Sequence, residues 1–388
     1  MTSQELATEL RGSGRTAGGI HVTPDRAMQL AAVYSCVRVR SELLAQIPLF
    51  VLRRETTGRT RALNHPLFPL LNAQPNEFQT SFEWREMCEA HLCLSGNAYN
   101  LKTYVRGQLA ELIPLAPSLM EVSQDPTTKR IRYSLRLPSG EPKEFTAAQI
   151  LHFRGQSLDG FTGLSPVGYQ RELIGMGLQM VEHGARQFSN GAMIGGVLEH
   201  PGALSKPARE RLRDDFDARH SGLSNAHKTL LLEEGMKFNA TGMNAKDAQF
   251  LESRKMSRTE IAGMFRVPPH LIGDNERSTF SNMEQADIGV VKYTLGPTLG
   301  RWEGRMNLDL LTPAERAAGL YTHFVVDGLL RGDYKTRTEG YQKAIAAGWM
   351  SPNEVRELED LDRVDGLDYY QRPLATEALG PDGGQGGT

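Results

Sequence analysis

The segment from Asn244 to Val267 places the strongest constraint on how this chain can fold. It is predicted to form a helix roughly 35 Å long, at about 1.5 Å per residue. The middle of that helix, Glu252–Glu260 (ESRKMSRTE), is polar nearly all round. Such a helix cannot be a core helix of a lone monomer, because it has no continuous apolar stripe to bury.

A polar loop follows this helix and leads to a second one. The loop lies between Val267–Gly273 (VPPHLIG) and Thr279–Gln285 (TFSNMEQ), and the second helix is expected from residue 282 to about residue 311. Gly296-Pro297 is predicted to break that helix, because proline removes a backbone hydrogen bond and clashes with the preceding turn. The nearby residues form no recognisable catalytic set. The region therefore favours a mechanical or binding role over chemistry.

Charge does not decide whether the chain contacts DNA. The formal net charge of −2 shows no global basic bias of the kind that a conventional nucleic-acid binder has. A conduit through which DNA must slide would, however, be hindered by a strongly attractive wall. The charge balance is therefore compatible with both a DNA conduit and a protein that never meets DNA.

Three cysteines, Cys36, Cys88 and Cys93, fit neither a metal site nor a disulfide framework. They are expected to be buried thiols in a reducing compartment. No apolar run approaches the ~18 residues that a membrane span needs, and the first residues lack the features of a signal peptide. The protein is expected to be cytosolic when made. Residues 11–19 near the start and 380–388 at the end are expected to be flexible.

The first 164 residues are predicted to form one α+β domain. A helix begins at Thr23-Pro24 and closes at Pro48, and a short strand follows it. Two further helices are expected over residues 64–72 and 80–96. From residue 98 to 153 the hydrophobic period changes to two, which predicts a half-buried antiparallel sheet.

A long helix is predicted from Ser165-Pro166, and it contains Gly175, Gly177 and Gly184. Each glycine costs about 1 kcal/mol relative to alanine in a helix. Two interpretations stay open: the helix is merely weak, or its surface must be closely approached by another helix or a ligand.

Residues 191–240 are predicted to be a small separate unit. It contains a segment at 195–200, a charged surface helix from 205 to 220 and a strand at 228–233. After it, a strand at 321–327 and two short helices close the fold. Asp333 is expected to cap the first of these helices, and Ser351–Glu354 (SPNE) forms a capping box for the second.

The sequence offers little support for catalysis. It has no phosphate-binding P-loop, no dinucleotide fingerprint, no nucleophile elbow and no HExxH motif. Asp214, Asp215 and Asp217 could suggest a divalent-metal site, but on a surface helix between arginines such residues are far more often a solvated charged face. No enzyme activity, cofactor or metal is expected.

Several segments in a defined order resemble the portal proteins of tailed bacteriophages. The resemblance covers about residues 27–361, and it includes the loop motifs VPPHLIG and TFSNMEQ together with several pieces that precede them. The other pieces are Val33–Arg38 (VYSCVR), His65-Pro-Leu, Leu70-Leu-Asn, Pro75-Asn76, Gly96–Tyr99 (GNAY) and Gly163–Pro166 (GLSP).

The resemblance implies an α+β portal fold that assembles as a ring, usually of about twelve subunits. It implies a flexible arm at 1–25, a wing at 26–164 and stem helices at 165–190 and 241–266. A clip would lie at 191–240, and a tunnel loop, kinked helix and wing strand at 267–330. A crown at 331–375 and a disordered tail at 376–388 would complete the chain.

The resemblance also implies the partners and the residues that meet them. The ring would carry double-stranded DNA in and out of a capsid, and would contact the terminase large subunit, head–tail connector proteins and the major capsid protein or scaffold. It would be assembled in the host cytoplasm and reside at one vertex of the virion, with no membrane contact. The expected channel residues are Asn275, Arg277, Ser278, Thr279 and Asn282 in the tunnel loop, and Arg254, Lys255 and Arg258 in the stem.

Two other interpretations stay open. The three aspartates at 214, 215 and 217 could serve a metal-dependent DNA-processing enzyme, and the chain could be another structural head or tail protein. The stem cations could simply be solvated, and Ser281 could make the polar loop an ordinary capped turn.

Overall fold

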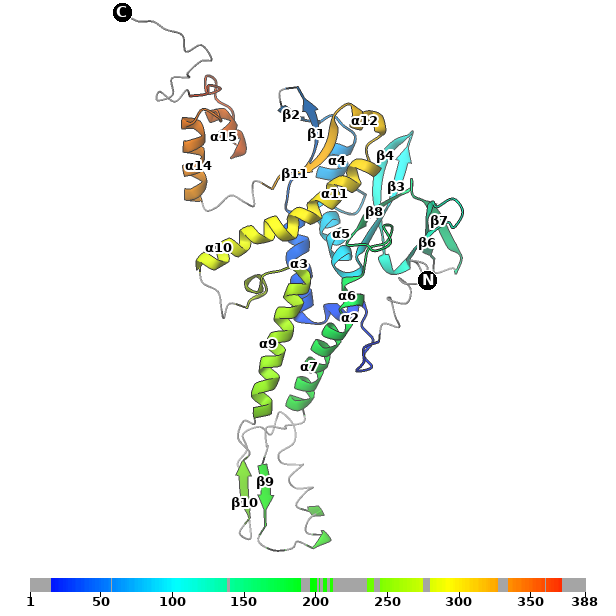
Figure 1. Cartoon of the computed structure of the whole chain (residues 1–388), viewed down its shortest axis with the longest axis vertical. Helices are drawn as coiled ribbons and strands as arrows, with labels where there is room; N and C mark the ends of the chain where they lie inside the picture. Colours follow the sequence, from blue (N-terminus) through cyan, green and yellow to red (C-terminus); the bar gives the residue numbers. More distant parts are fainter. Residues whose placement is uncertain are drawn as a thin grey trace, which may run out of the picture. The chain divides into compact units, whose positions relative to one another are not determined.

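The computed structural model describes residues 15–371 except 57, 138–139, 190–195, 201, 203–204, 208–209, 212–235, 241–244, 275–279, 327–333 and 360. The chain divides into two compact units, Met1–Val325 and Val326–Thr388 (Figure 1). Each unit has its own helices.

Four helices open the described part of the first unit, and polar caps begin two of them. Thr23 accepts a hydrogen bond from the Arg26 amide and begins α2, while Thr80 and Glu83 form a complete capping box. Gly96 ends α5 in the left-handed conformation, as glycine does at many helix ends. These helices are α2 (Pro24–Met28), α3 (Ala31–Ala45), α4 (Leu67–Asn72) and α5 (Ser81–Ser95).

Apart from one two-stranded pair described below, the strands that the structure describes form three separate three-stranded antiparallel sheets rather than one continuous sheet. Their orders are β4-β3-β8, β5-β6-β7 and β11-β1-β2. The single sheet predicted over residues 98–153 is therefore wrong, because alternation identifies a strand without identifying its neighbour. The strands are β1 (Leu49–Glu55), β2 (Gly58–Arg61), β3 (Asn97–Val105), β4 (Gln108–Leu115), β5 (Met120–Gln124), β6 (Ile131–Arg136), β7 (Pro142–Thr146), β8 (Ile150–Arg154) and β11 (Leu320–Phe324).

Aromatic side chains from distant parts of the chain form one core. Trp302 stacks on Phe153 at a centroid distance of 4.0 Å and meets Trp84 edge-on at 5.8 Å. Phe324 lies 6.2 Å from the same ring. Because strand β11 pairs with β1 and helix α11 (Gly296–Asp309) covers it, the α+β region draws on residues well beyond position 164.

The long helix predicted from Ser165-Pro166 is divided in two. Ser165 caps the short helix α6 (Pro166–Tyr169), and α7 (Arg171–Ser189) starts after a break at Gln170. β9 (Gly196–Glu199) pairs with β10 (Lys237–Ala240), and the chain then enters α9 (Ala245–Phe265). The strand predicted at 228–233 and most of the helix predicted at 205–220 lie outside the described residues.

The helix expected to break at Gly296-Pro297 instead continues through that site. α10 (Phe280–Gly289) runs into a π-helical segment, Val290–Leu295, and then into α11. Pro297 occupies the first turn of α11, where proline is tolerated. Pro297 has no backbone N–H to donate. The wider hydrogen-bond spacing of the π-helical segment accommodates this loss, so the backbone stays helical. A short α12 (Pro313–Ala317) precedes β11.

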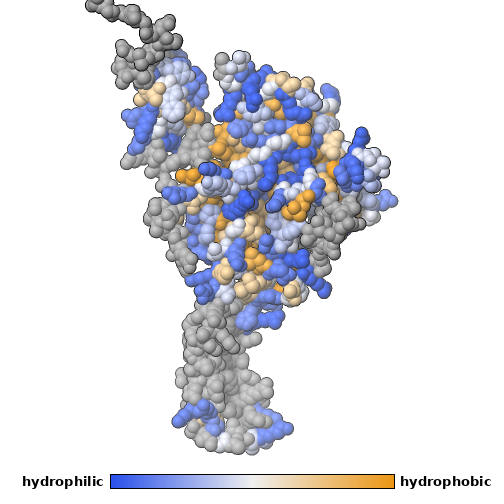
Figure 2. All heavy atoms as spheres, viewed as in Figure 1, coloured by the Kyte–Doolittle hydropathy of each residue, from blue (hydrophilic) through white to orange (hydrophobic). Residues whose placement is uncertain are grey.

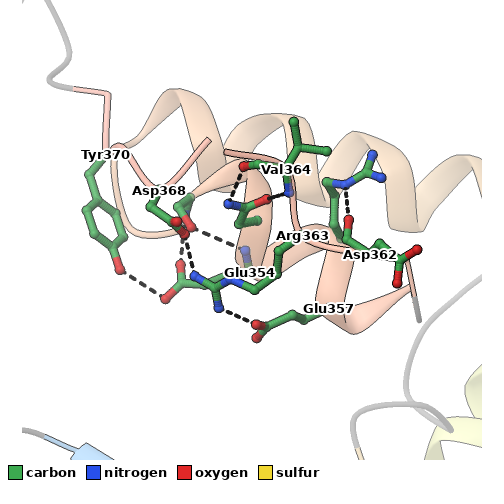
Figure 3. Close-up of polar contacts among 10 residues, drawn as sticks. Glu354, Glu357, Asp362, Arg363, Val364, Asp368 and Tyr370 are labelled. Carbon is green, nitrogen blue, oxygen red and sulfur yellow. Dashed lines mark hydrogen bonds and ion pairs between the residues drawn. The ribbon is translucent and has the colours of Figure 1, made fainter. Parts of the chain in front are cut away.

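The second unit contains α14 (Tyr334–Ala346) and α15 (Pro352–Leu358). Ser351 and Glu354 form the predicted capping box, whereas Asp333 lies outside the described residues. The segment after α15 folds back over it (Figure 3): both side-chain groups of Asn353 hydrogen-bond to the backbone of Val364 at 2.9 Å. Arg363 adds ion pairs with Glu357 and Asp368.

Candidate nucleic-acid interface

Helices α7 and α9 lie side by side, and α9 carries the stem cations predicted to face DNA (Figure 1). They meet at Gly177, where a methyl group on the glycine would lie 3.5 Å from Ser257 Oγ. Ser257 is only 4% exposed. Ile174 of α7 and Ile261 of α9 belong to the same apolar cluster. The polar helix is therefore anchored by one apolar end.

The structure resolves the two interpretations of the α7 glycines. An added Cβ at Gly177 would lie 2.7 Å from Leu30 Cδ2, and one at Gly175 would collide with the Thr16 side chain. No described atom lies within 4 Å of the same position at Gly184. Gly175 and Gly177 therefore permit close approach, while Gly184 has no packing reason in the described part of the chain.

Residues 15–22 lie against α7, although residues 11–19 were expected to be a flexible leader. Thr16 is buried beside Gly175, and the Ala17 amide donates to the Glu172 carboxylate at 3.1 Å. The Gln179 side chain donates to the Gly18 carbonyl. This segment packs on α7 because Gly175 leaves room for the Thr16 side chain. Glu172 supplies a hydrogen-bond acceptor on one side of that space, and Gln179 supplies a donor on the other.

The middle of α9 is exposed, as its composition predicts. Residues 252–256 are all solvent-accessible, including Arg254 and Lys255, whereas Ile261, Ala262 and Phe265 are fully buried. The helix is thus polar in its middle and apolar at its C-terminal end. Figure 1 shows that buried end meeting the body of the first unit.

Arg258 differs from the two cations that precede it. It is partly buried, and its guanidinium donates to the Ile272 carbonyl at the end of the short 3-10 helix Pro269–Ile272. Gly273 then takes a left-handed conformation with φ of 79°. Arg258 therefore fixes the start of the polar loop, a role that the sequence interpretation did not include.

Both described ends of that loop are tied to the helices around it. His270 Nε2 lies 2.9 Å from Asp287 Oδ1 on α10, and the Thr294 hydroxyl donates to the Arg266 carbonyl at 2.8 Å. Asn275, Arg277, Ser278 and Thr279 lie outside the described residues. Asn282 lies in α10, but its side chain is outside the described part.

A buried ion pair joins the helices behind the interface. Arg40 donates to Glu89 at 2.7 Å, to the Phe265 carbonyl at 3.3 Å and to Thr298 Oγ1 at 3.3 Å. Burial raises the pKa of Glu89, while Arg40 acts in the opposite direction. Sequence reasoning missed this junction, because Arg40 and Glu89 lie on different helices and no local pattern links them.

A second buried network joins Gly96–Tyr99 to Gly163–Pro166, which are distant in sequence. Asn97 accepts from the Gly163 amide at 2.7 Å and donates to its carbonyl at 2.9 Å. His152 Nε2 lies 2.9 Å from Asn97 Oδ1, and the Tyr133 hydroxyl lies 3.1 Å from His152 Nδ1. Burial lowers the pKa of His152 well below its ordinary value, so the ring is neutral. The network positions the chain just before α7.

The described residues contain no group of three or more His, Cys, Asp and Glu side chains arranged to hold a metal ion. Asp214, Asp215 and Asp217 lie outside that part of the chain. All three cysteines are free and buried, as predicted. Among the described helices, none has the length and apolar character needed to cross a membrane.

Comparisons with known proteins agree on one family. Its profile, described as phage portal protein, matches residues 31–360. The chain is 32% identical to the portal protein of Enterobacteria phage HK97, over 92% of this chain and 84% of that protein. It is 34% identical to the probable portal protein of Streptomyces phage phiC31, over 94% of this chain and 82% of that protein.

Among solved structures, the fold is similar to a chain from the neck of a native gene transfer agent particle, computed with C12 symmetry. The TM-score is 0.60 at 22% identity, and the match covers 94% of this chain and 99% of that one. At this level of identity the likeness concerns the fold alone.

Proposed function

Because the chain belongs to the phage portal protein family, we propose that it assembles as a ring at one capsid vertex, through which double-stranded DNA is packaged and later ejected. Members of this family are structural proteins rather than enzymes, and the chain is a component of the phage or particle neck. We propose the segment assignments and the partners on the same basis.

The observation that carries the proposal is the exposed polar middle of α9 beside α7. A helix this polar is a poor element for a lone monomer, since residues 252–256 are all exposed. In a ring, one face of this helix would pack on a neighbouring copy, and another face would line a water-filled channel. We assign α7 and α9 to the stem on this basis.

The remaining segments follow the order of the family. Residues 26–164 and 267–330 form the wing, 191–240 the clip and 331–375 the crown. The clip docks the terminase large subunit and then the head–tail connector proteins, while the wing meets the major capsid protein or scaffold. The C12 symmetry with which the similar neck structure was computed supports twelve copies.

The polar loop would then ring the channel once per subunit. Asn275, Arg277, Ser278, Thr279 and Asn282 are polar, and they suit contacts with phosphates that ignore base sequence. Arg254 and Lys255 on the exposed face of α9 would line the stem. Arg258 was expected beside them, but its guanidinium donates to the Ile272 carbonyl, so we assign it to anchoring the loop.

Assembly mass tests the proposal. Twelve copies of the 43.0 kDa chain give a particle of roughly 0.5 MDa, with a central hole visible by electron microscopy. Light scattering on the purified full-length protein measures that mass directly. A stable monomer that hydrolyses DNA would overturn the proposal. The variant Asp214→Ala/Asp215→Ala should assemble normally and have no hydrolysis to lose.

Arg277→Ala tests the loop within the assembled particle. The loop carries one arginine among small polar residues, so this change removes its one cation. Rings should form with unchanged mass, while the amount of DNA retained in filled particles should fall. Normal DNA retention in the variant would show that the loop does not hold phosphates.

A further inference from the structure

The hairpin β1–β2 presents a group of cations away from every segment assigned to the channel. Alternation along the strands places Phe50, Arg54, Arg59, Arg61 and Tyr321 on one side of the sheet β11-β1-β2, which we call the arginine face. The buried Leu52 and His323, which is paired with Glu303, lie on the same side. All three arginines are exposed. Figure 2 shows hydrophilic side chains gathered over the end where Figure 1 labels β2.

Aromatic rings hold two of these arginines in place. The Arg61 guanidinium carbon lies 4.4 Å from the Phe50 ring centroid, and that of Arg54 lies 5.6 Å from the Tyr321 centroid. Such cation–π contacts leave the N–H edges of a guanidinium free to donate. The arginine face is therefore preorganised, since its long side chains have already lost part of their rotational freedom.

The opposite side of the sheet packs into the protein. Thr322 and Phe324 lie there, and the Thr322 amide and hydroxyl both donate to Asn307 of α11. The hairpin's one acidic residue, Glu55, is also on that side and accepts a hydrogen bond from Thr60. The sheet thus separates a structural face from the arginine face.

Two arginines of the arginine face repel each other, and no acidic side chain among the described residues pairs with them. Arg54 and Arg59 are directly opposite one another across β1 and β2, and like charges in that position destabilise a sheet. None of the three arginines forms an ion pair with any residue that the structure describes. An anionic partner from outside the chain would turn this cost into an attraction.

We infer that the arginine face binds the phosphate backbone of double-stranded DNA outside the channel. Arg59 and Arg61 lie roughly 6.8 Å apart along the strand, at about 3.4 Å per residue. Duplex DNA carries one charge per ~1.7 Å of its axis, so neighbouring arginines meet separate phosphates of one backbone. We expect these contacts to be made with phosphates, which carry no sequence information, so binding should be independent of sequence.

DNA suits this face better than an acidic protein segment does. Recognition of a particular peptide needs several different hydrogen-bonding groups around the charges, and the exposed charges of this face are three arginines beside aromatic rings. A uniformly charged polymer needs nothing else. The choice of DNA rests on the proposed portal function, which brings DNA to the protein, whereas the geometry of the face does not depend on it.

Binding to covalently closed circular plasmid tests the inference, because a closed circle cannot thread through a preassembled ring. The variant is Arg54→Gln/Arg59→Gln/Arg61→Gln in the full-length protein. The matched control is Arg106→Gln/Lys129→Gln/Arg130→Gln, which removes three exposed cations from turns between other strands. Both variants change the net charge equally, so a difference between them reports position.

The face variant should bind the circle on the order of tenfold more weakly. Its log–log slope against salt should be smaller by about 2 to 3, at about 0.9 for each phosphate that the protein no longer neutralises. The control should behave like the parent. A second variant with lysine at the same three positions should recover most of the slope, since lysine keeps the charge.

Three results would overturn the inference. The face variant could bind the circle as tightly as the control, or it could lose affinity for poly-glutamate but not for DNA, which would indicate an acidic protein partner. Failure of the face variant alone to reach the parent's particle mass would indicate a contact between subunits. If the parent itself stayed monomeric, the proposed portal function would fail, and circle binding would still be measurable on the monomer.

Discussion

Arg40 and Glu89 form an ion pair with a 2.7 Å contact where helices α3, α5, α9 and α11 meet. The Glu89 side chain is 1% exposed and that of Arg40 is 19% exposed. A pair this deeply buried gains little over an apolar pair of the same shape, but losing one partner leaves a charge without compensation. The end of the polar helix α9 is held by this pair through the Phe265 carbonyl.

Removing one member of this pair should therefore be costly. Arg40→Met is expected to lower the free energy of unfolding by about 3 to 5 kcal/mol, because Glu89 stays buried without its cation. Urea unfolding of the full-length protein measures this loss. Arg40→Met/Glu89→Leu should regain much of it, and a double variant as unstable as the single one would contradict the explanation.

The glycines of α7 provide a matched comparison within one helix. Gly177→Ala should destabilise the protein by about 1 to 3 kcal/mol, since the new methyl group would lie 2.7 Å from Leu30 Cδ2 and force that side chain to move. Gly184→Ala should stabilise it by up to about 1 kcal/mol, because the site is open and alanine is the better helix former. Thermal unfolding of both variants gives the two signs. Equal effects would show that packing does not distinguish the positions.

These glycines illustrate what could be predicted from sequence. Local signals identified the helix starts at Thr23 and near residue 80 and the capping box at Ser351, because a cap is made by residues a few positions apart. The contact that separates Gly177 from Gly184 involves residue 30, and nothing near the glycines encodes it.

The same limit applies to the sheets and to the polar loop. A period of two identified the strands, but pairing of β1 with β11 spans most of the chain and depends on how the core closes. The missing backbone N–H of Pro297 predicted an irregularity at this position. A break in the helix and a π-helical segment can both accommodate that missing group, and the sequence did not distinguish them. The role of Arg258 depends on the position of the Ile272 carbonyl in the folded chain, and the local sequence does not indicate that position.

Stability should depend on pH through His152. Burial holds its pKa well below the ordinary value, whereas in the unfolded chain the ring takes up a proton below about pH 6.5. The unfolded state therefore binds the extra proton, so stability is full above that pH and falls as the pH drops, by at most about 1.4 kcal/mol per pH unit. Urea midpoints measured between pH 5 and 8 should show the slope. His152→Gln should reduce the slope of stability against pH by the contribution of one bound proton. An unchanged slope would exclude His152 as the cause.

Arg258 and Arg254 should have different roles although they are one turn apart. Arg258→Ala leaves the Ile272 carbonyl without its donor, at a cost of about 1 to 3 kcal/mol, and should speed amide hydrogen exchange over residues 269–274. Arg254→Ala removes an exposed cation and should leave exchange in that segment unchanged. Identical exchange in both variants would contradict the anchoring role of Arg258.

Asn353 should control the order of the segment after α15. Its side chain is 1% exposed and makes both hydrogen bonds to Val364. Asn353→Ala leaves a backbone donor and acceptor unpaired, and residues 361–367 should become more sensitive to limited proteolysis. Asn353→Asp keeps the acceptor alone and should give an intermediate cleavage rate. Unchanged cleavage in the alanine variant would show that Asn353 is not the anchor.

The three buried cysteines make the protein convenient to label. Burial raises the pKa of both Cys36 and Cys88 to about 12 and also raises that of Cys93, so none presents a reactive thiolate to solvent near neutral pH. A maleimide dye or photocrosslinker would therefore react with a single cysteine introduced at position 59 or 277 and leave the native thiols unmodified. The path of DNA over this protein can be mapped one residue at a time without first constructing a cysteine-free background.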